Sequence, residues 1–192
     1  MTVQTVIVLA AGEGTRMKSA TPKVLHSVAG RSLLGHVLHA VDQLHPFELR
    51  IVVGSGRAAV EAHIADISPT ATTIFQEHRG GTGHAAQLAL AGTAPKGTVL
   101  LLAGDTPLLT GDSLAQFVQA HTAGKFAASV LTAEHPEPTG YGRIIRDNSD
   151  ELLRIVEEKD ATDDEKFIYE ITIALIINYI RSQDYIDLFI LI

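Results

Sequence analysis

Cysteine and tryptophan are both missing from the 192 residues of this sequence. The absence of cysteine excludes disulfide bonds, zinc sites built from thiolates and a cysteine nucleophile. Aromatic residues make up only 5% of the chain, whereas 46% of its residues are hydrophobic. This composition is typical of an α/β enzyme whose catalytic groups are not thiols.

Basic side chains are also few. The 15 Lys and Arg are outnumbered by 22 Asp and Glu, which gives a net charge of -7. Because these basic residues are spread along the chain, they form no extended basic face of the kind that binds nucleic acid. We expect no nucleic-acid partner, although a small phosphorylated ligand needs only a local basic cluster.

The sequence shows no evident membrane-spanning segment or signal peptide. The uncharged run from Ile171 to Ile180 is shorter than the about 20 residues that a membrane-spanning helix needs. Met1 to Leu9 lacks the basic segment of a signal peptide. We therefore expect a cytoplasmic protein that does not enter a membrane.

The chain does contain short apolar runs that alternate with segments of helical period. This alternation is typical of a mainly parallel sheet with right-handed crossovers. We predict a Rossmann-like α/β fold, with a twisted sheet covered by helices on both faces. The expected strands lie near 6–8, 49–53, 71–76, 98–103, 126–132, 151–156 and 171–177. The expected helices cover 33–44, 57–67 and 112–123, and the glycine-rich turn 80–83 opens a further helix.

The first strand leads into a glycine-containing loop, VIVLAAGEGTRMKSATPK, residues 6–23. Gly12 and Gly14 let backbone N–H groups approach an anion, and basic side chains follow at short spacing. Met17 stands where a dinucleotide-binding loop needs its third glycine, and no P-loop lysine motif occurs. The loop indicates a polyphosphate site, but a plain turn with surface charges fits this stretch alone equally well.

Two further loops place polar groups after expected strands. The amide of Gln76, before the glycine-rich turn 80–83, can donate and accept as the reading of a pyrimidine edge requires. Asp105, between Gly104 and Pro107, can hold Mg²⁺ against phosphate oxygens. Taken alone, a glutamine such as Gln76 is more often an exposed surface side chain, and Asp105 is equally well explained as a cap of the turn before the next helix. Ligands sit over the carboxyl ends of parallel strands, so we expect the three loops to meet at one rim.

Five segments in order, LAAGEGTRMKSATPKVLH, QEHRGGTGHA, GDTPLL, GYGRI and IVEEKDAT, carry a family resemblance. The chain resembles the bacterial bifunctional N-acetylglucosamine-1-phosphate uridylyltransferases and glucosamine-1-phosphate acetyltransferases. The first segment is shared by many sugar nucleotidyltransferases, whereas PKVLH, GTGHA and GYGRI together point to this family. The likeness covers roughly residues 5–166. It implies that 1–192 is a truncated N-terminal uridylyltransferase domain, with an atypical tail from about 167 and without the acetyltransferase domain.

The resemblance implies that UTP and N-acetylglucosamine 1-phosphate give UDP-N-acetylglucosamine and pyrophosphate, with Mg²⁺, for cell-wall precursor synthesis. Arg16 and Lys23 would act on the phosphates as catalytic residues, and Asp105 would hold the metal. The implied nucleotide-binding residues are Leu9, Ala10, Ala11, Gly12, Gly14, Lys23, Gln76, Gly81, Thr82, Ala103, Gly104 and Asp105. Gly140, Glu157 and the position of Thr172 would face the sugar. The parent protein would be a homotrimer through its C-terminal domain.

One departure from the family pattern concerns the sugar side. Where the family continues Glu-Ile with an Asn-Ser/Thr-Gly turn, this chain has Thr172, Ile173 and Ala174. The missing Asn predicts a chain that folds around the nucleotide site and turns over slowly. Two other interpretations stay open: a nucleotidyltransferase for CTP or another sugar or alcohol phosphate, and a non-catalytic module that senses a nucleotide or serves in an interaction.

Overall fold

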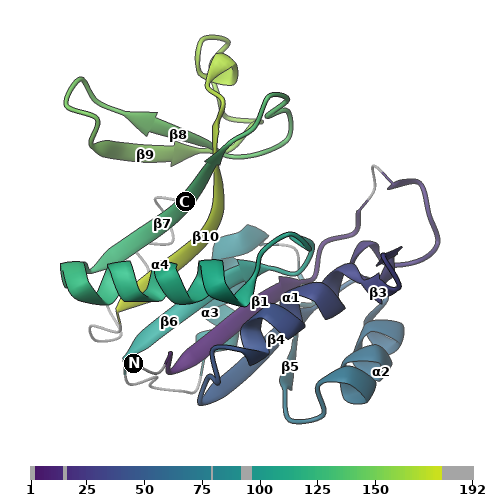
Figure 1. The fold of residues 1–192 in the computed structure, drawn as a ribbon. Coiled ribbons are helices and arrows are strands. Elements are labelled where there is room, and N and C mark those ends of the chain that lie inside the picture. Colours follow the sequence, from purple (N-terminus) through teal and green to yellow (C-terminus); the bar gives the residue numbers. More distant parts are fainter. Residues whose placement is uncertain (1–2, 15–16, 79, 92–96, 179–192) are drawn as a thin grey trace. The chain divides into compact units, whose positions relative to one another are not determined.

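The computed structural model describes residues 3–14, 17–78, 80–91 and 97–178, and Figure 1 shows their backbone. The chain divides into two compact units. Of the described residues, 3–129 and 176–178 belong to the first unit, and 130–175 belong to the second.

The first unit is built on a parallel sheet. Strand β1 (Thr5–Ala10) pairs with β4 (Glu48–Val53) on one side and with β6 (Thr98–Ala103) on the other. Strand β5 (Thr72–Phe75) pairs with β4 on its far side, again in parallel. Valine, isoleucine and leucine dominate β1, β4 and β6, because strands that are covered on both faces need no alternation of polar and apolar residues.

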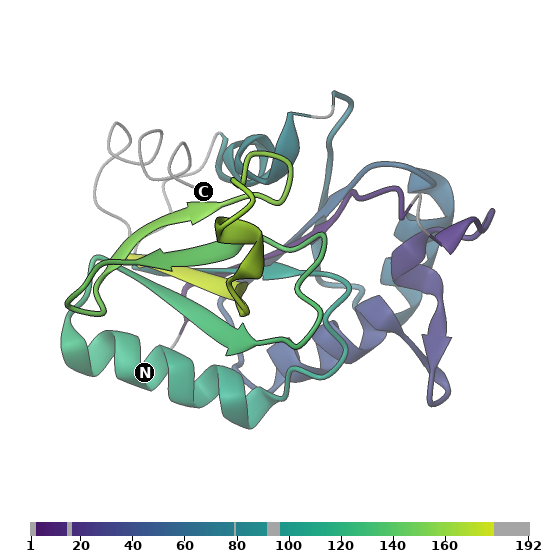
Figure 2. The same cartoon turned by 90° about the horizontal axis from the view of Figure 1, so that it is seen from above.

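Helices cover both faces of this sheet, as the sequence predicts. Helices α1 (Leu33–Asp42) and α4 (Gly111–Gly124) lie on one face, and α3 (Gly81–Leu90) lies on the other (Figures 1 and 2). Helix α2 (Arg57–Ile67) follows β4 and contacts it. The large buried residues of α1 recur with helical spacing: Leu33, Leu34, Val37, Leu38 and Val41.

Short elements connect the glycine-containing loop to α1. A single 3-10 turn, η2 (Lys23–Leu25), follows the loop, and the small hairpin of β2 (Ser27–Val28) and β3 (Arg31–Ser32) leads into the helix. In the described residues no helix has the length and apolar character needed to cross a membrane.

The second unit is built from antiparallel pairs. Strand β8 (Arg143–Arg146) lies between β9 (Leu152–Val156) and β10 (Glu170–Asn178) and is antiparallel to both. Strand β7 (Ala128–Glu134) also pairs with β10, and a 3-10 turn, η3 (Glu165–Phe167), precedes β10. Because the connection between β8 and β9 is short, these strands can pair only as a hairpin, which the strand–helix alternation did not reveal.

Ser32, the residue immediately before α1, allows a test of local stability. Ser32 Oγ accepts a hydrogen bond from the backbone N–H of Gly35 at 2.9 Å and lies 2.7 Å from His63 Nε2 on α2. Ser32→Ala removes both interactions, so we expect it to lower the free energy of unfolding by about 1 kcal/mol in urea titrations. The exposed Ser27→Ala should change it by less than about 0.5 kcal/mol. Equal losses in the two variants would contradict the capping role.

Candidate functional site

The carboxyl ends of the four parallel strands of the first unit lie at one rim. In the strand register, Ala10 at the end of β1 pairs with Val53 at the end of β4, which in turn pairs with the last residue of β5. Leu9 pairs with Ala103, the last residue of β6. The segments that follow these strands therefore emerge side by side, as the alternation of strands and helices predicted.

Backbone hydrogen bonds hold the predicted loops to this rim. The N–H of Gly104 donates to the carbonyl of Leu9 at 2.9 Å, and the N–H of Gln76 donates to the carbonyl of Val53 at the same distance. The residues predicted at the end of β1 are buried or half-buried as far as Ala11, and Gly12 is exposed. The structure thus brings the start of the glycine-containing loop beside the Gly104–Asp105 turn.

Gly14 allows the glycine-containing loop to fold back on itself. Its φ is +62°, and a Cβ placed there would lie 2.5 Å from Lys23 Cβ. A side chain at this position would therefore push Lys23 away as well as strain the backbone. Among the described residues, apart from its two chain neighbours, none has an atom within 4 Å of the position of a Cβ at Gly12, so open space adjoins this part of the loop. Arg16 lies outside the described residues.

Lys23 and Asp105 form an ion pair between Lys23 Nζ and Asp105 Oδ2. Their side chains are 33% and 28% exposed, so both remain accessible to a ligand at the rim. The sequence predicted a role for each residue separately, but it did not predict that they contact each other. The turn that carries Asp105 is closed by the hydroxyl of Thr106, which donates to the carbonyl of Ala103 at 3.0 Å.

Gln76 is buried and oriented by the first turn of α3. Its Nε2 donates to the carbonyl of Gly81 at 3.2 Å and lies 3.1 Å from His84 Nδ1. Gly81 and Thr82 are exposed at the start of this helix, where backbone N–H groups favour anions. His84 was not among the predicted site residues, and its only trace in the sequence was its place in the GTGHA segment.

A magnesium site is compatible with the carboxylate at the rim. Within the described part of the chain, no three histidine, aspartate or glutamate side chains are grouped so that they could enclose a metal ion. Mg²⁺, however, commonly binds through one or two carboxylates together with substrate phosphates and water. Asp105, half-buried beside a lysine and a glycine-containing loop, fits that kind of site.

The residues predicted to face a sugar lie together in the second unit. Arg143 of β8 is in register with the residue before Glu157 on one side and with the residue before Thr172 on the other. Glu157 Cδ lies 3.9 Å from the position of a Cβ at Gly142, in the same turn as Gly140. The Thr172 hydroxyl is buried and has no hydrogen-bond partner among the described residues.

Glu158 and Arg143 fix the turn that carries Gly140, and the sequence did not single out either residue. Glu158 Oε2 accepts the backbone N–H of Gly140 at 3.1 Å and Arg143 Nη2 at 2.6 Å. Arg143, whose side chain is almost fully buried, also donates to the carbonyl of Tyr141. The N–H of Gly140 and the guanidinium of Arg143 lower the pKa of the Glu158 carboxyl.

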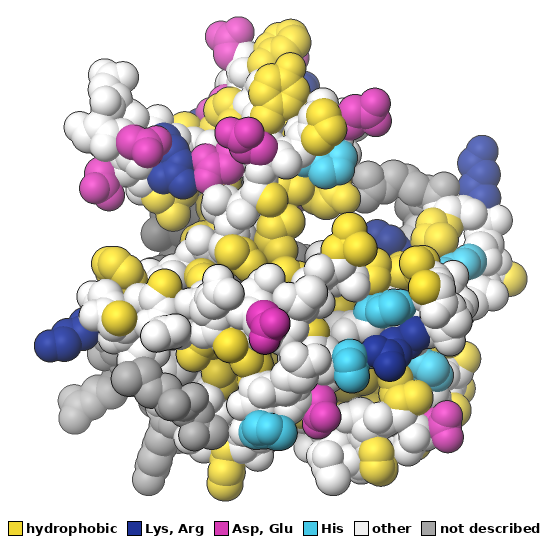
Figure 3. Space-filling view, viewed as in Figure 1, with side chains coloured by type: hydrophobic (Ala, Val, Ile, Leu, Met, Phe, Trp, Pro, Cys, Tyr) yellow, Lys and Arg dark blue, Asp and Glu magenta, His cyan; other side chains and the backbone are white. Residues whose placement is uncertain are grey.

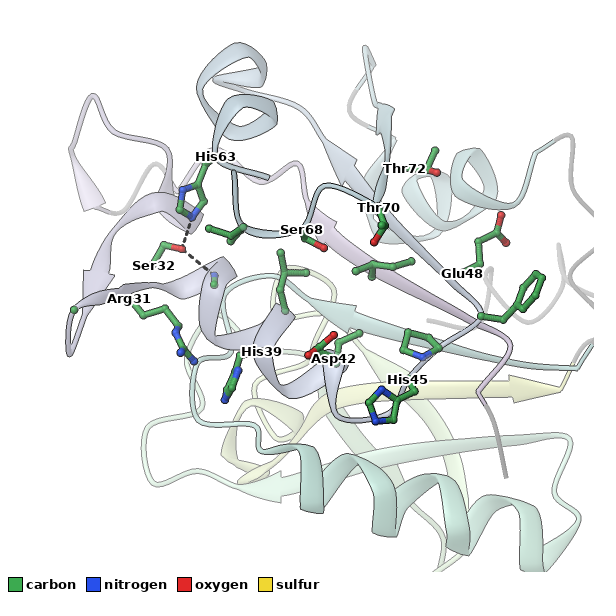
Figure 4. A pocket seen from close by; sticks show the side chains of 18 residues that line it. Arg31, Ser32, His39, Asp42, His45, Glu48, His63, Ser68, Thr70 and Thr72 are labelled. Carbon is green, nitrogen blue, oxygen red and sulfur yellow. Dashed lines mark hydrogen bonds between the residues drawn. The ribbon is translucent and has the colours of Figure 1, made fainter. Parts of the chain in front are cut away.

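A cavity of about 870 Å³ lies in the first unit between α1 and α2 (Figure 4). It is lined by, among others, Arg31, His39, Asp42 and His63. Figure 3 shows histidine and basic side chains gathered on the face over α1 and β3. Because none of the described residues predicted for the site lines this cavity, it is not the space formed by the rim loops.

The family of MobA-like NTP transferase domains matches residues 6–168 of the chain. The bifunctional protein GlmU of Streptomyces avermitilis is 53% identical over 169 residues, covering 86% of this chain and 35% of that protein. GlmU of Thermobifida fusca is 50% identical over 171 residues, with the same two shares. The chain thus spans about a third of the length of these relatives.

Two solved structures share the fold. A UDP-glucose pyrophosphorylase complexed with UDP-glucose has a TM-score of 0.70 at 18% identity, covering 92% of this chain and 76% of that one. HddC from Yersinia pseudotuberculosis, complexed with GMP-PN, has a TM-score of 0.69 at 18% identity, covering 92% and 77%. At this identity the two structures support the α/β fold alone.

The lowered pKa of Glu158 predicts a pH-dependent contribution to stability. The carboxyl has an ordinary pKa of 4.5, and the folded chain lowers it. Its contribution is therefore present above the unfolded-state pKa and is lost as the pH falls through the folded-state pKa. We expect Glu158→Gln to lower the melting temperature at neutral pH. The difference in melting temperature between this variant and the unsubstituted chain should become smaller below pH 4.5.

The matched control for this measurement is Glu137→Gln, an exposed glutamate of the same unit. It should leave the melting temperature nearly unchanged at every pH. A gap for Glu158→Gln that stays constant down to about pH 3 would show that the charge of the carboxylate is not the cause.

Proposed function

The chain belongs to the family of MobA-like NTP transferase domains, and we propose that it transfers a uridylyl group from UTP to N-acetylglucosamine 1-phosphate. The observation that carries the proposal is the Lys23–Asp105 ion pair beside the glycine-containing loop. Identity of about half of the aligned residues to GlmU proteins supports this choice of substrates. The products are UDP-N-acetylglucosamine, a precursor of the cell wall, and pyrophosphate.

The reaction needs no strong general base. The second pKa of a phosphate monoester is about 6, so the attacking phosphate oxygen is largely deprotonated at neutral pH. It attacks the α-phosphorus of UTP, and the bond from that phosphorus to the pyrophosphate oxygen breaks. The protein then has two tasks, to hold the two anions in line and to balance the charge on the pyrophosphate that leaves.

In this proposal the groups at the rim carry out the second task. Lys23 exchanges its contact with Asp105 for the nucleotide phosphates, while the loop around Gly12 and Gly14 offers backbone N–H groups. Asp105 would hold Mg²⁺, which when bound neutralises charge on the phosphate oxygens. Arg16, which the family resemblance also implies for the phosphates, is proposed on that ground alone.

The remaining predicted residues would surround the base and the sugar. Leu9, Ala10, Ala11, Ala103 and Gly104 form the backbone at the rim, and Gln76, Gly81 and Thr82 would read the uracil edge. Gly140, Glu157 and Thr172 would face the sugar. Since threonine is shorter than asparagine and its hydroxyl is buried, we expect weak sugar binding and slow turnover.

Two further proposals concern the whole protein. We propose that the parent protein forms a homotrimer through a C-terminal part that lies outside this sequence. The cytoplasmic location expected from the sequence also stays a prediction.

Removing either member of the ion pair tests the phosphate site. We expect Lys23→Ala to lower kcat/KM by roughly a hundredfold, or about 3 kcal/mol of transition-state stabilisation, because one preorganised cation is lost. We expect Asp105→Ala to abolish Mg²⁺-dependent binding of UTP in calorimetry. The exposed ion pair of Lys166 and Asp163 supplies matched controls, and Lys166→Ala and Asp163→Ala should change neither quantity.

The outcome separates the interpretations. Near-normal turnover of Lys23→Ala would contradict the proposed catalytic role. Absence of nucleotide binding by the unsubstituted chain would favour a module without a nucleotide site, and UTP binding without any turnover would favour a non-catalytic nucleotide-binding module.

Competition between nucleotides tests the proposed role of Gln76. If its amide reads the uracil edge, UTP should compete more strongly than CTP for the site. Gln76→Ala should reduce that preference by about fivefold, the effect of one hydrogen bond of about 1 kcal/mol. A chain that prefers CTP would instead support a cytidylyltransferase, and an unchanged preference in Gln76→Ala would remove Gln76 from base recognition.

A further inference from the structure

The turn between β4 and α2, residues 54–56, lies at the rim beside the glycine-containing loop. Strand β4 ends at Val53, which is in register with Ala10 at the end of β1. The first residues of this turn and of the loop therefore leave neighbouring strands side by side. The predicted binding residues do not include the turn, which carries no charge or catalytic group.

Gly54 contacts the beginning of the loop. A Cβ on Gly54 would lie 2.6 Å from the carbonyl oxygen of Ala11, 2.9 Å from its Cβ and 3.0 Å from its Cα. Ala11 is held by the sheet register just before it, so its backbone cannot rotate away as a flexible side chain could. An alanine at position 54 would therefore displace the backbone of Ala11, where the loop leaves β1.

Gly56 contacts the end of the same loop. A Cβ on Gly56 would overlap Cγ of Pro22, whose ring is rigid, and the φ of Gly56 is +70°. Pro22 directly precedes Lys23 at the start of η2, and α2 and η2 are in contact. A displacement of Pro22 would therefore move Lys23, whose Nζ pairs with Asp105.

The loop is thus fixed at both ends by one turn. Ala11 rests on Gly54, and Pro22 rests on Gly56, while Gly14 lets the middle of the loop close onto Lys23. Each contact is possible only because the residue in the turn has no side chain. Catalytic groups have to be held within about 0.5 Å of their working positions, which a loop anchored at one end alone does not achieve.

We propose that Gly54 and Gly56 are positioning residues that set the glycine-containing loop, and through Pro22 the ammonium group of Lys23, for phosphoryl transfer. The proposal rests on the proposed function for its effect on turnover. The contacts themselves are independent of that function, so their disturbance can be measured without a substrate.

The experiment is a double-mutant cycle between the turn and the loop. Gly56→Ala introduces the overlap, and Pro22→Ala removes the Cγ atom that it meets, leaving only a contact of 3.4 Å to Cβ. The control for backbone strain is Gly30→Ala. Gly30 has a φ of +82°, and in the described part of the chain only its two chain neighbours can have atoms within 4 Å of its Cβ position. Melting temperatures show that each variant is folded.

Turnover provides the first readout. We expect Gly56→Ala to lower kcat by roughly tenfold to a hundredfold with a smaller change in the KM for UTP, because a shift of about 1 Å impairs the transition state most. Gly30→Ala should leave kcat within about twofold of the unsubstituted value. In the double variant, Pro22→Ala should restore at least half of the rate that Gly56→Ala loses. The two substitutions act on one contact, so their effects on the rate are not additive.

Amide chemical shifts provide the second readout and need no substrate. In Gly56→Ala the amides of Lys23 and Gly14 should move, and adding Pro22→Ala should return them toward their original positions. If Gly56→Ala moves them no more than Gly30→Ala does, or if Pro22→Ala has no effect on the change, the proposal is overturned. If the unsubstituted chain shows no turnover but the amide chemical shifts change as expected, the proposed function is overturned and the positioning contacts are still established.

Gly54→Ala gives an independent test if Gly56→Ala does not fold. Its control is again Gly30→Ala, where a Cβ has open space among the described residues. Gly54→Ala should shift the amides of Ala11 and Gly12 and lower kcat, whereas Gly30→Ala should do neither. Unchanged amides in a folded Gly54→Ala would contradict the proposal.

Discussion

The parallel pairing of β1 with both β4 and β6 is the constraint on which the candidate nucleotide site depends. Parallel strands begin at one edge of the sheet and end at the other, so each chain segment must return through a helix before the next strand. The loops that follow β1, β4, β5 and β6 are therefore forced to the same rim. Groups far apart in the sequence become neighbours there without any attraction between the groups themselves.

Backbone packing then gives these loops their shape. The absence of side chains at Gly14, Gly54 and Gly56 allows Lys23, Ala11 and Pro22, respectively, to approach more closely than an alanine would permit. A charged pair, Lys23 and Asp105, joins the loop after β1 to the loop after β6. Because both side chains remain partly exposed, water screens this attraction, and the pair contributes less to stability than to the placement of charge at the rim.

The second unit is stabilised by different interactions from those of the first. Its strands pair antiparallel, and a buried guanidinium replaces part of an apolar core. Arg143 is acceptable there because Glu158 and the carbonyl of Tyr141 pair its two terminal nitrogens, which offsets part of the loss of hydration of a buried cation, while its Nε has no partner among the described residues. The same carboxylate binds the N–H of Gly140, so one acidic side chain orients the turn that is proposed to contact the sugar.

The α/β class, the mainly parallel sheet, the helices on both of its faces and most element boundaries could be predicted from the residues alone. Apolar period and turn residues are local properties, and helix α2 and strand β6 match the predicted ranges 57–67 and 98–103. Residue type also singled out Gln76 and Asp105 as polar groups at strand ends. Their functional roles stay predictions, because residue type does not reveal a ligand.

Which of these groups contact one another depends on the three-dimensional fold. The pairing of Lys23 with Asp105, the support of Pro22 by Gly56 and the binding of Gly140 by Glu158 all join residues that are distant in the chain. The antiparallel second unit was also not evident, since strand direction depends on how a connection closes. Such contacts follow from strand register and close packing in three dimensions, and no local pattern of residues records them.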